Sequence, residues 1–188
     1  MLDHYPKEIM TKDGTPILIR PFAKKDQAKL REFFSRISEE ERWFIRDDLS
    51  DPEVMDKWMQ GTDYTRTIPL IAVKQEDGTI LGNVTLYMTL SDCVSHVAHL
   101  RIVIDPEYRQ QRLGTWMLID AIKLAMDLGL EKLFAEFVGG VDEAAMAAAQ
   151  RLDFFEQGVL RDHFKDQHGR YRDLIIMVKN FHRDWSDF

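Results

Sequence analysis

The chain has 188 residues, of which 45% are hydrophobic and 30% charged, and its formal net charge is −7 at pH 7. A chain of this length and balance is expected to fold around one substantial apolar core. The negative charge argues against broad binding to nucleic acids or anionic membranes, and the longest apolar runs are too short to cross a bilayer. We therefore expect a single domain over residues 1–188, without a nucleic-acid or membrane partner.

The cysteine content and the first residues bear on location. Cys93 is the one cysteine, so it cannot form an internal disulfide, which fits a reducing compartment. The first ten residues carry acidic and polar residues where a signal peptide needs a basic start and an apolar stretch. We expect a cytoplasmic protein, and the sequence leaves open whether it forms a homodimer. No metal site is indicated, because His96 and His99, three residues apart, would lie on opposite faces of a strand.

Residues 1–65 are predicted to form one strand followed by helices. The strand is expected at Ile17–Arg20. A helix after it carries apolar residues at positions 30, 33, 34 and 37, the spacing of one helical face. Three capping signals mark expected helix starts: Asp26, Ser38 with Glu41, and Asp51-Pro52.

The remaining chain mixes strands with two longer helices. Strands are predicted at residues 68–74, 80–89, 96–104, 132–138, 157–164 and 171–179, and helices at 113–128 and 143–152. In the helix at 113–128, the polar residues Asp120, Lys123 and Asp127 form one narrow stripe, so the rest of its surface should be buried. Residues 66–138 would form the central sheet and 139–188 a closing helix and hairpin. The predicted fold is α/β (α+β type): a mixed, largely antiparallel twisted sheet of about seven strands, flanked by helices.

The segment Ile102–Met117, IVIDPEYRQQRLGTWM, is the most informative for chemistry. A strand ends at a proline, a basic loop follows, and an apolar helix begins. The first amides of a helix lack intrahelical partners and, with the helix dipole, attract anions. Arg109 and Arg112 add positive charge, and Gly114 would let a ligand approach the backbone. The segment is a candidate pyrophosphate cradle; the alternative is an ordinary turn with two solvated arginines. Neither a P-loop nor a dinucleotide-binding glycine motif is present.

This segment resembles the acetyl-CoA loop of the GNAT superfamily, V-x-P-x-Y-[RQ]-x-x-G-x-G-x-x-L-L. Residues at matching positions are Ile104, Pro106, Tyr108, Arg109, Gly114 and Leu118. Arg112 departs from the pattern, because it stands where the family usually has its first glycine. The likeness extends over most of the chain, from the N-terminal helices after Ile19 to a "klGF"-like ending at Gln150–Phe155 and the closing hairpin.

The resemblance implies a GNAT-like fold and acetyl-CoA as co-substrate. It assigns the backbone of Ile102, Val103 and Ile104 to the pantetheine arm. Asp142, at the position of a frequent asparagine, is assigned to the cofactor as well. The residues placed around or beside the pyrophosphate are Arg109, Gln110, Gln111, Arg112, Leu113, Gly114 and Thr115.

The implied activity is an N-acetyltransferase acting on a primary amine of a small metabolite, peptide or protein. A lysine-like amine costs about 4–5 kcal/mol to deprotonate at pH 7, so a general base is expected. His99, on the strand before the loop, and Glu136, in the strand at 132–138, are the two candidates. Each has a structural alternative: His99 as a histidine beside the sheet, and Glu136 as a carboxylate paired with an arginine.

The proton donor for the CoA thiolate is less evident. Many family members have a tyrosine in the helix before "klGF", and Ala149 occupies that position here. This departure, with Asp142 and Arg112, supports an alternative hypothesis, namely a catalytically weak acyl-CoA-binding or sensory protein of the same fold.

Overall fold

The computed structural model describes residues 2, 4–45, 48–61, 64–89 and 91–181. Within these residues, eight strands form one sheet in the order β1-β2-β3-β4-β5-β6-β8-β7. Only the β5–β6 pair in this sheet is parallel. The strands are β1 (Lys7–Met10), β2 (Pro16–Pro21), β3 (Thr67–Lys74), β4 (Ile80–Met88), β5 (Val97–Ile104), β6 (Lys132–Val138), β7 (Phe155–Lys165) and β8 (Tyr171–Asn180). The predicted α/β fold with a largely antiparallel sheet is confirmed, with β1 as an additional strand.

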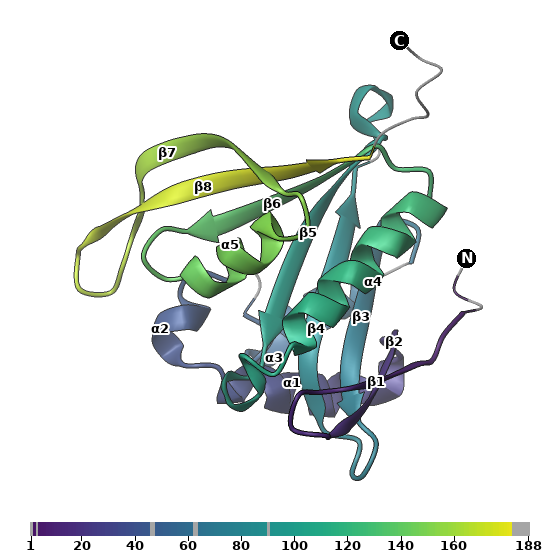
Figure 1. The fold of residues 1–188 in the computed structure, drawn as a ribbon. Coiled ribbons are helices and arrows are strands. Elements are labelled where there is room, and N and C mark those ends of the chain that lie inside the picture. Colours follow the sequence, from purple (N-terminus) through teal and green to yellow (C-terminus); the bar gives the residue numbers. More distant parts are fainter. Residues whose placement is uncertain (1, 3, 46–47, 62–63, 90, 182–188) are drawn as a thin grey trace.

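Helices cover both faces of the sheet (Figure 1). α1 (Gln27–Arg36) and α3 (Pro52–Gly61) lie on one face, with the one-turn helix α2 (Glu39–Arg42) between them in the chain. α4 (Leu113–Asp127) and α5 (Glu143–Gln150) lie on the other face. Short 3-10 turns stand at Lys24–Asp26, Asp92–Val94 and Pro106–Tyr108. No helix within the described ranges is long and apolar enough to cross a membrane.

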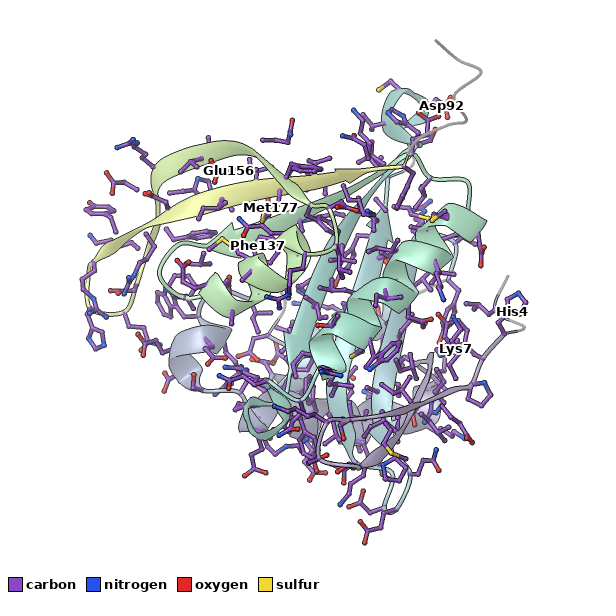
Figure 2. All side chains as sticks on the ribbon, in the orientation of Figure 1. His4, Lys7, Asp92, Phe137, Glu156 and Met177 are labelled. Atoms are coloured by element: carbon purple, nitrogen blue, oxygen red, sulfur yellow. The ribbon has the colours of Figure 1, made fainter. Side chains whose placement is uncertain are left out.

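Each face of the sheet has its own apolar cluster, because successive strand residues point to opposite sides. On β5, Leu100 belongs to the cluster beneath α4 and α5 and Ile102 packs against it, whereas Val103 packs against the cluster beneath α1 and α3. Phe137 and Met177, from the neighbouring strands β6 and β8, belong to the first cluster and are labelled in Figure 2. This alternation decides to which face of the sheet each site residue of β5 and β6 points.

β5 and β6 are neighbours over only part of their length. Their pairing runs from Val97 with Lys132 to Leu100 with Ala135. Beyond that point β5 continues to Ile104 and β6 to Val138, and the two strands diverge (Figure 1). The crossover between them is α4, which starts next to the divergent end of β5.

The strand that the sequence did not predict, β1, covers part of α4. Tyr5 Oη donates a 2.6 Å hydrogen bond to Asp120 Oδ2, and Lys7 Nζ forms an ion pair with the same carboxylate. Asp120 is therefore buried, at 5% exposure, and the predicted solvent-facing polar stripe of this helix is wrong at that position. A buried carboxylate needs such charged and hydrogen-bonding partners, and both come from the far N-terminal segment.

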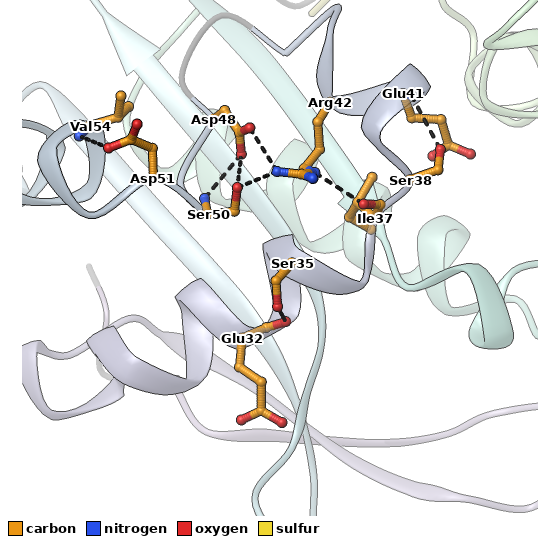
Figure 3. Close-up of polar contacts among 10 residues, drawn as sticks. All are labelled: Glu32, Ser35, Ile37, Ser38, Glu41, Arg42, Asp48, Ser50, Asp51 and Val54. Atoms are coloured by element: carbon orange, nitrogen blue, oxygen red, sulfur yellow. Dashed lines mark hydrogen bonds and ion pairs between the residues drawn. The ribbon is translucent and has the colours of Figure 1, made fainter.

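Two of the three predicted helix caps are present. Ser38 Oγ accepts from Glu41 N at 3.3 Å, and Asp51 Oδ1 accepts from Glu53 N and Val54 N at 2.8 and 3.3 Å; Figure 3 shows the Ser38 contact and the one to Val54. Asp26 precedes α1 but makes no side-chain cap.

The carboxylate of Asp26 has other partners. It accepts two hydrogen bonds from the Arg20 guanidinium, at 2.6 and 2.8 Å, and one from Ala23 N at 3.0 Å. A paired guanidinium is a stronger partner for a carboxylate than an amide. The predicted capping role of Asp26 is therefore wrong.

Candidate functional site

The loop between β5 and α4 ends in an unusual backbone conformation. Arg112, the residue before α4, has φ +66° and ψ 0°, in the left-handed region, and its side chain makes no capping bond. Gln110 also has a positive φ, of 60°. The first intrahelical bond of α4 runs from Trp116 N to Arg112 O, so the amides of residues 113–115 lie at the open N-terminal end of the helix. This end, preceded by a basic loop, has the features of an anion site.

Two further features of this helix end bear on ligand binding. A Cβ added at Gly114 would meet Ile104 Cγ1 at 3.4 Å, an ordinary van der Waals contact, so the protein's own packing does not require glycine there. Gln111 Oε1 is buried and, among the described residues, has no hydrogen-bond partner. The loop itself is held by the β1–β2 turn, because Lys12 N donates to Gln111 O at 3.1 Å. The cradle therefore combines a fixed loop, free helix amides and an unsatisfied acceptor.

Arg109 lies in the same loop, in contact with the N-terminal helices. Its Nη1 and Nη2 donate to the two carboxylate oxygens of Glu41 at 2.9 and 2.5 Å. Its Nε donates to Ile104 O at 3.3 Å. The hydrogen bonds that Arg109 donates to Glu41 raise the pKa of Arg109 above its usual value. The guanidinium thus links the end of β5 to α2.

The three strand residues expected to line the cofactor lie on the divergent part of β5. Ile102, Val103 and Ile104 are half-buried although they belong to an inner strand of the sheet. Their exposure follows from the end of the β5–β6 pairing at Leu100. Backbone groups of this stretch on the side of β6 are available to an extended ligand, since strand groups without a neighbour can pair with an added chain.

Asp142 immediately precedes α5, close to the end of β6. Its Oδ2 accepts from Val138 N at 2.7 Å. Burial raises the pKa of Asp142, and the neighbouring Glu41 carboxylate adds to that increase, while the Val138 hydrogen bond and Arg109 act in the opposite direction. Asp142, Arg109 and Glu41 therefore interact electrostatically, although they come from three separate segments.

The two candidate bases lie together. His99 Nε2 is 3.7 Å from Glu136 Oε2, with side chains 33% and 32% exposed. Because β5 and β6 run parallel with His99 beside Phe134, both side chains point to the face that carries α1 and α3. The His99 ring also packs edge-on against Phe134, with centroids 5.0 Å apart. This pair stands where the two strands begin to diverge.

A third polar side chain on this face was not singled out from the sequence. Tyr87 on β4 pairs across from His99 and receives a 3.4 Å hydrogen bond from Trp58 Nε1. The Arg101 guanidinium stacks over its ring at 5.4 Å. The alternation of Asn83, Thr85 and Tyr87 with apolar residues along β4 is the signal that could have identified it.

Comparison with known proteins identifies the family of the chain. The model of the acetyltransferase (GNAT) family matches residues 28–154. The chain belongs to the GNAT acetyltransferase family. This confirms the resemblance seen in the sequence, and acetyl-CoA is the co-substrate of such a protein.

Individual relatives support the assignment at different levels. An acetyltransferase of Pseudomonas aeruginosa is 26% identical over 155 residues, covering 80% of this chain and 77% of the relative. A GNAT-family acetyltransferase structure from Streptococcus pneumoniae is 26% identical, with a TM-score of 0.73 and coverage of 88% and 99% of the two chains. The Salmonella typhimurium protein yncA, solved with its cofactor acetyl-CoA, is 17% identical, with a TM-score of 0.74 and coverage of 90% and 96%, and shows the shared fold.

The departures from the GNAT pattern have structural explanations. Arg112 replaces the first glycine of the loop and adopts the left-handed conformation that glycine takes without strain. Ala149, where a tyrosine is frequent, is 1% exposed and lies in the core beneath α5. Ala149 therefore supplies no proton donor at this position.

Proposed function

We propose that this GNAT protein transfers the acetyl group of acetyl-CoA to a primary amine of a small metabolite, peptide or protein. The observation that carries the proposal is the juxtaposition along β5 of two features. The open start of α4 follows the end of this strand, and the His99–Glu136 pair stands where its pairing with β6 stops. An anion site and a proton-accepting pair are thus joined by a half-buried strand.

The cradle residues bind the diphosphate of CoA in this proposal. The amides of Leu113, Gly114 and Thr115 donate to phosphate oxygens, and the side chain of Arg112 adds charge. Gln110 and Gln111 complete the loop, and Gln111 Oε1 accepts from a hydroxyl or amide of the cofactor. Hydrogen bonds from free helix amides are well suited to diphosphate.

The strand and the helix after it hold the rest of the molecule. The backbone of Ile102, Val103 and Ile104 pairs with the amide groups of the pantetheine arm, and Asp142 borders the arm from the start of α5. In this proposal, residues 1–65 border the amine, residues 66–138 hold the cofactor, and residues 139–188 close the site.

His99 and Glu136 act as a unit in the proton transfer. His99 accepts the proton of the attacking ammonium, directly or through water, and the carboxylate 3.7 Å away stabilises the imidazolium that forms. The neutral amine then attacks the thioester carbonyl, the carbon–sulfur bond breaks, and the proton that the new amide nitrogen loses passes through water to the CoA thiolate. A thiolate is a stable enough leaving group for this step without a dedicated acid.

Two measurements test the proposal. CoA at 100 times its dissociation constant should stabilise the protein by about 2.7 kcal/mol, which raises Tm by about 5–11 °C for a chain of this size. A panel of amines with acetyl-CoA should then release free thiol. Absence of CoA binding in calorimetry would refute the function itself.

The role of the pair is tested by substitution. His99→Gln and Glu136→Gln should each lower kcat about 10²–10⁴-fold while CoA still binds. The kcat of the double variant should be little lower than that of the less active single variant. His96→Gln, just before the same strand, is the control and should retain activity. Tight CoA binding without turnover on any amine would instead favour a weak acyl-CoA-binding or sensory protein.

The cytoplasmic location and the formation of a homodimer stay predictions.

A further inference from the structure

The guanidinium of Arg109 is engaged by the protein on three of its N–H groups. Two bind the Glu41 carboxylate side by side, at 2.9 and 2.5 Å, and the third binds Ile104 O at 3.3 Å. Paired bonds of this kind fix orientation as well as distance. Arg109 therefore holds a defined position between β5 and α2, where it is not available as a fully free cation.

The two residues that follow α2 contact a second part of the molecule. Trp43 Nε1, directly after the helix, donates to Lys165 O at the end of β7, at 2.9 Å. The Phe44 ring packs edge-on against Phe164 at 5.7 Å. α2 thus bridges the loop before α4 and the β7–β8 hairpin, and these two regions flank the divergent ends of β5 and β6 (Figure 1).

α2 has an anchor of its own that does not involve Arg109. Arg42 donates to Ile37 O at 3.1 Å and to Asp48 at 3.0 Å, and it also contacts Ser50 (Figure 3). Ser38 caps the start of the turn. These contacts tie α2 to its flanking segments, whereas the Arg109–Glu41 pair ties it to the cofactor loop.

We propose that Arg109 is a positioning residue which, through Glu41, holds α2 as the wall of the amine-binding side, rather than a phosphate ligand. This inference rests on the acetyltransferase function proposed above and assigns to the Arg109–Glu41 pair a role in amine binding. It predicts that loss of either partner loosens α2 and weakens amine binding, while the free amides of α4 continue to bind CoA.

The effect of Glu41→Gln on CoA affinity distinguishes a positioning role of Arg109 from phosphate binding. If Arg109 positions α2, Glu41→Gln and Arg109→Gln behave alike. Each raises the amide exchange rate of residues 38–45 at least tenfold and the KM for the active amine three- to tenfold. The Kd for CoA changes less than threefold, and the double variant is no worse than either single variant. If Arg109 binds phosphate, Glu41→Gln releases a competing carboxylate and tightens CoA binding, whereas Arg109→Gln weakens it tenfold or more.

The control is Glu40→Gln on the same turn. Glu40 is 59% exposed on its side chain and lies 3.7 Å from the equally exposed Arg170, so its loss removes one charge from α2 without touching Arg109. It should leave exchange, KM and Kd unchanged. The positioning role is overturned if exchange in residues 38–45 stays at the wild-type rate in Glu41→Gln, or if CoA affinity shifts in opposite directions in the two variants. A wild-type protein that binds no CoA refutes the proposed function, and the exchange measurement then still decides whether the pair holds α2.

Discussion

Gly114→Glu should stabilise the fold and weaken CoA binding several hundredfold, and these opposite effects make it the sharpest test of the cradle. Gly114 lies in the first turn of α4, and an added Cβ makes only an ordinary contact with Ile104. Replacing glycine in a helix by a better helix former contributes about 0.5–1 kcal/mol, and an acidic residue in the first turn adds about 0.3–1 kcal/mol. At 2–4 °C per kcal/mol for this chain length, Tm should rise by about 2–8 °C.

The same carboxylate would stand beside the diphosphate. At a separation of about 4–5 Å and an effective dielectric constant near 20, the repulsion is about 3–4 kcal/mol per phosphate charge, equivalent to a several hundredfold loss of affinity. Gly114→Gln has nearly the same shape without the charge, so the ratio of the two dissociation constants isolates the electrostatic part. That ratio should fall as salt is added, because exposed charges are screened.

Calorimetric titration of CoA into wild type, Gly114→Gln and Gly114→Glu at low and high salt measures the effect, and thermal unfolding measures stability. Equal CoA affinity for the Glu and Gln variants at low salt would show that no phosphate lies at the start of α4. A fall in Tm for both would show that the contact with Ile104 is tighter than 3.4 Å implies.

Three further substitutions test the description of individual residues. Burial raises the pKa of Asp142, so folding favours the protonated form of its carboxyl group. The stability that this group contributes is therefore lost as the pH rises from the pKa in the unfolded chain through the pKa in the folded protein. The Tm of Asp142→Asn minus that of wild type should therefore increase from pH 4 to pH 7, and parallel curves would contradict this. Arg112→Gly removes a left-handed strain of about 1–2 kcal/mol against an entropic cost of about 0.5–1 kcal/mol. Its Tm should rise by up to about 6 °C, and a clear fall would contradict the strain. Tyr5→Phe deletes the hydrogen bond to Asp120 and should cost about 1.5–3 kcal/mol in urea unfolding; a loss below about 0.5 kcal/mol would mean that Lys7 alone satisfies that carboxylate.

Most of the fold could be read from local patterns, since strand periodicity and turn residues are properties of short segments. The strand predicted at 132–138 agrees with β6 (Lys132–Val138), and Gly129, just after α4, has the left-handed conformation in which many helices end, with φ +73°. β1 was missed because four residues with alternating half-buried and exposed side chains give little signal. The burial of Asp120 was missed because its partner Tyr5 lies 115 positions away in the chain.

In the candidate site too, one part could be predicted from local sequence and another part could not. The cradle is contained in one continuous segment, so its loop, charge and helix start could be recognised together. The proximity of His99 and Glu136 depends on β5 and β6 being parallel neighbours in one register, and the Arg109–Glu41 bond joins residues 68 positions apart. Neither pairing leaves a trace in local spacing, which is why the sequence offered two competing bases rather than one pair.

The distance between the start of α4 and the His99–Glu136 pair limits the kind of ligand that can contact both. His99 and Ile104 lie on the same strand, five positions apart, which corresponds to roughly 16 Å of extended chain. A small anion at the start of α4 could not reach the His99–Glu136 pair, and a small thioester beside that pair could not use the helix amides. A molecule that carries a diphosphate at one end and a reactive acyl group at the other, joined by a flexible amide-containing arm, contacts both centres and the unpaired stretch of β5 between them. Acyl-CoA has this composition, and the divergence of β5 from β6 therefore supports the proposal that the two centres form one site.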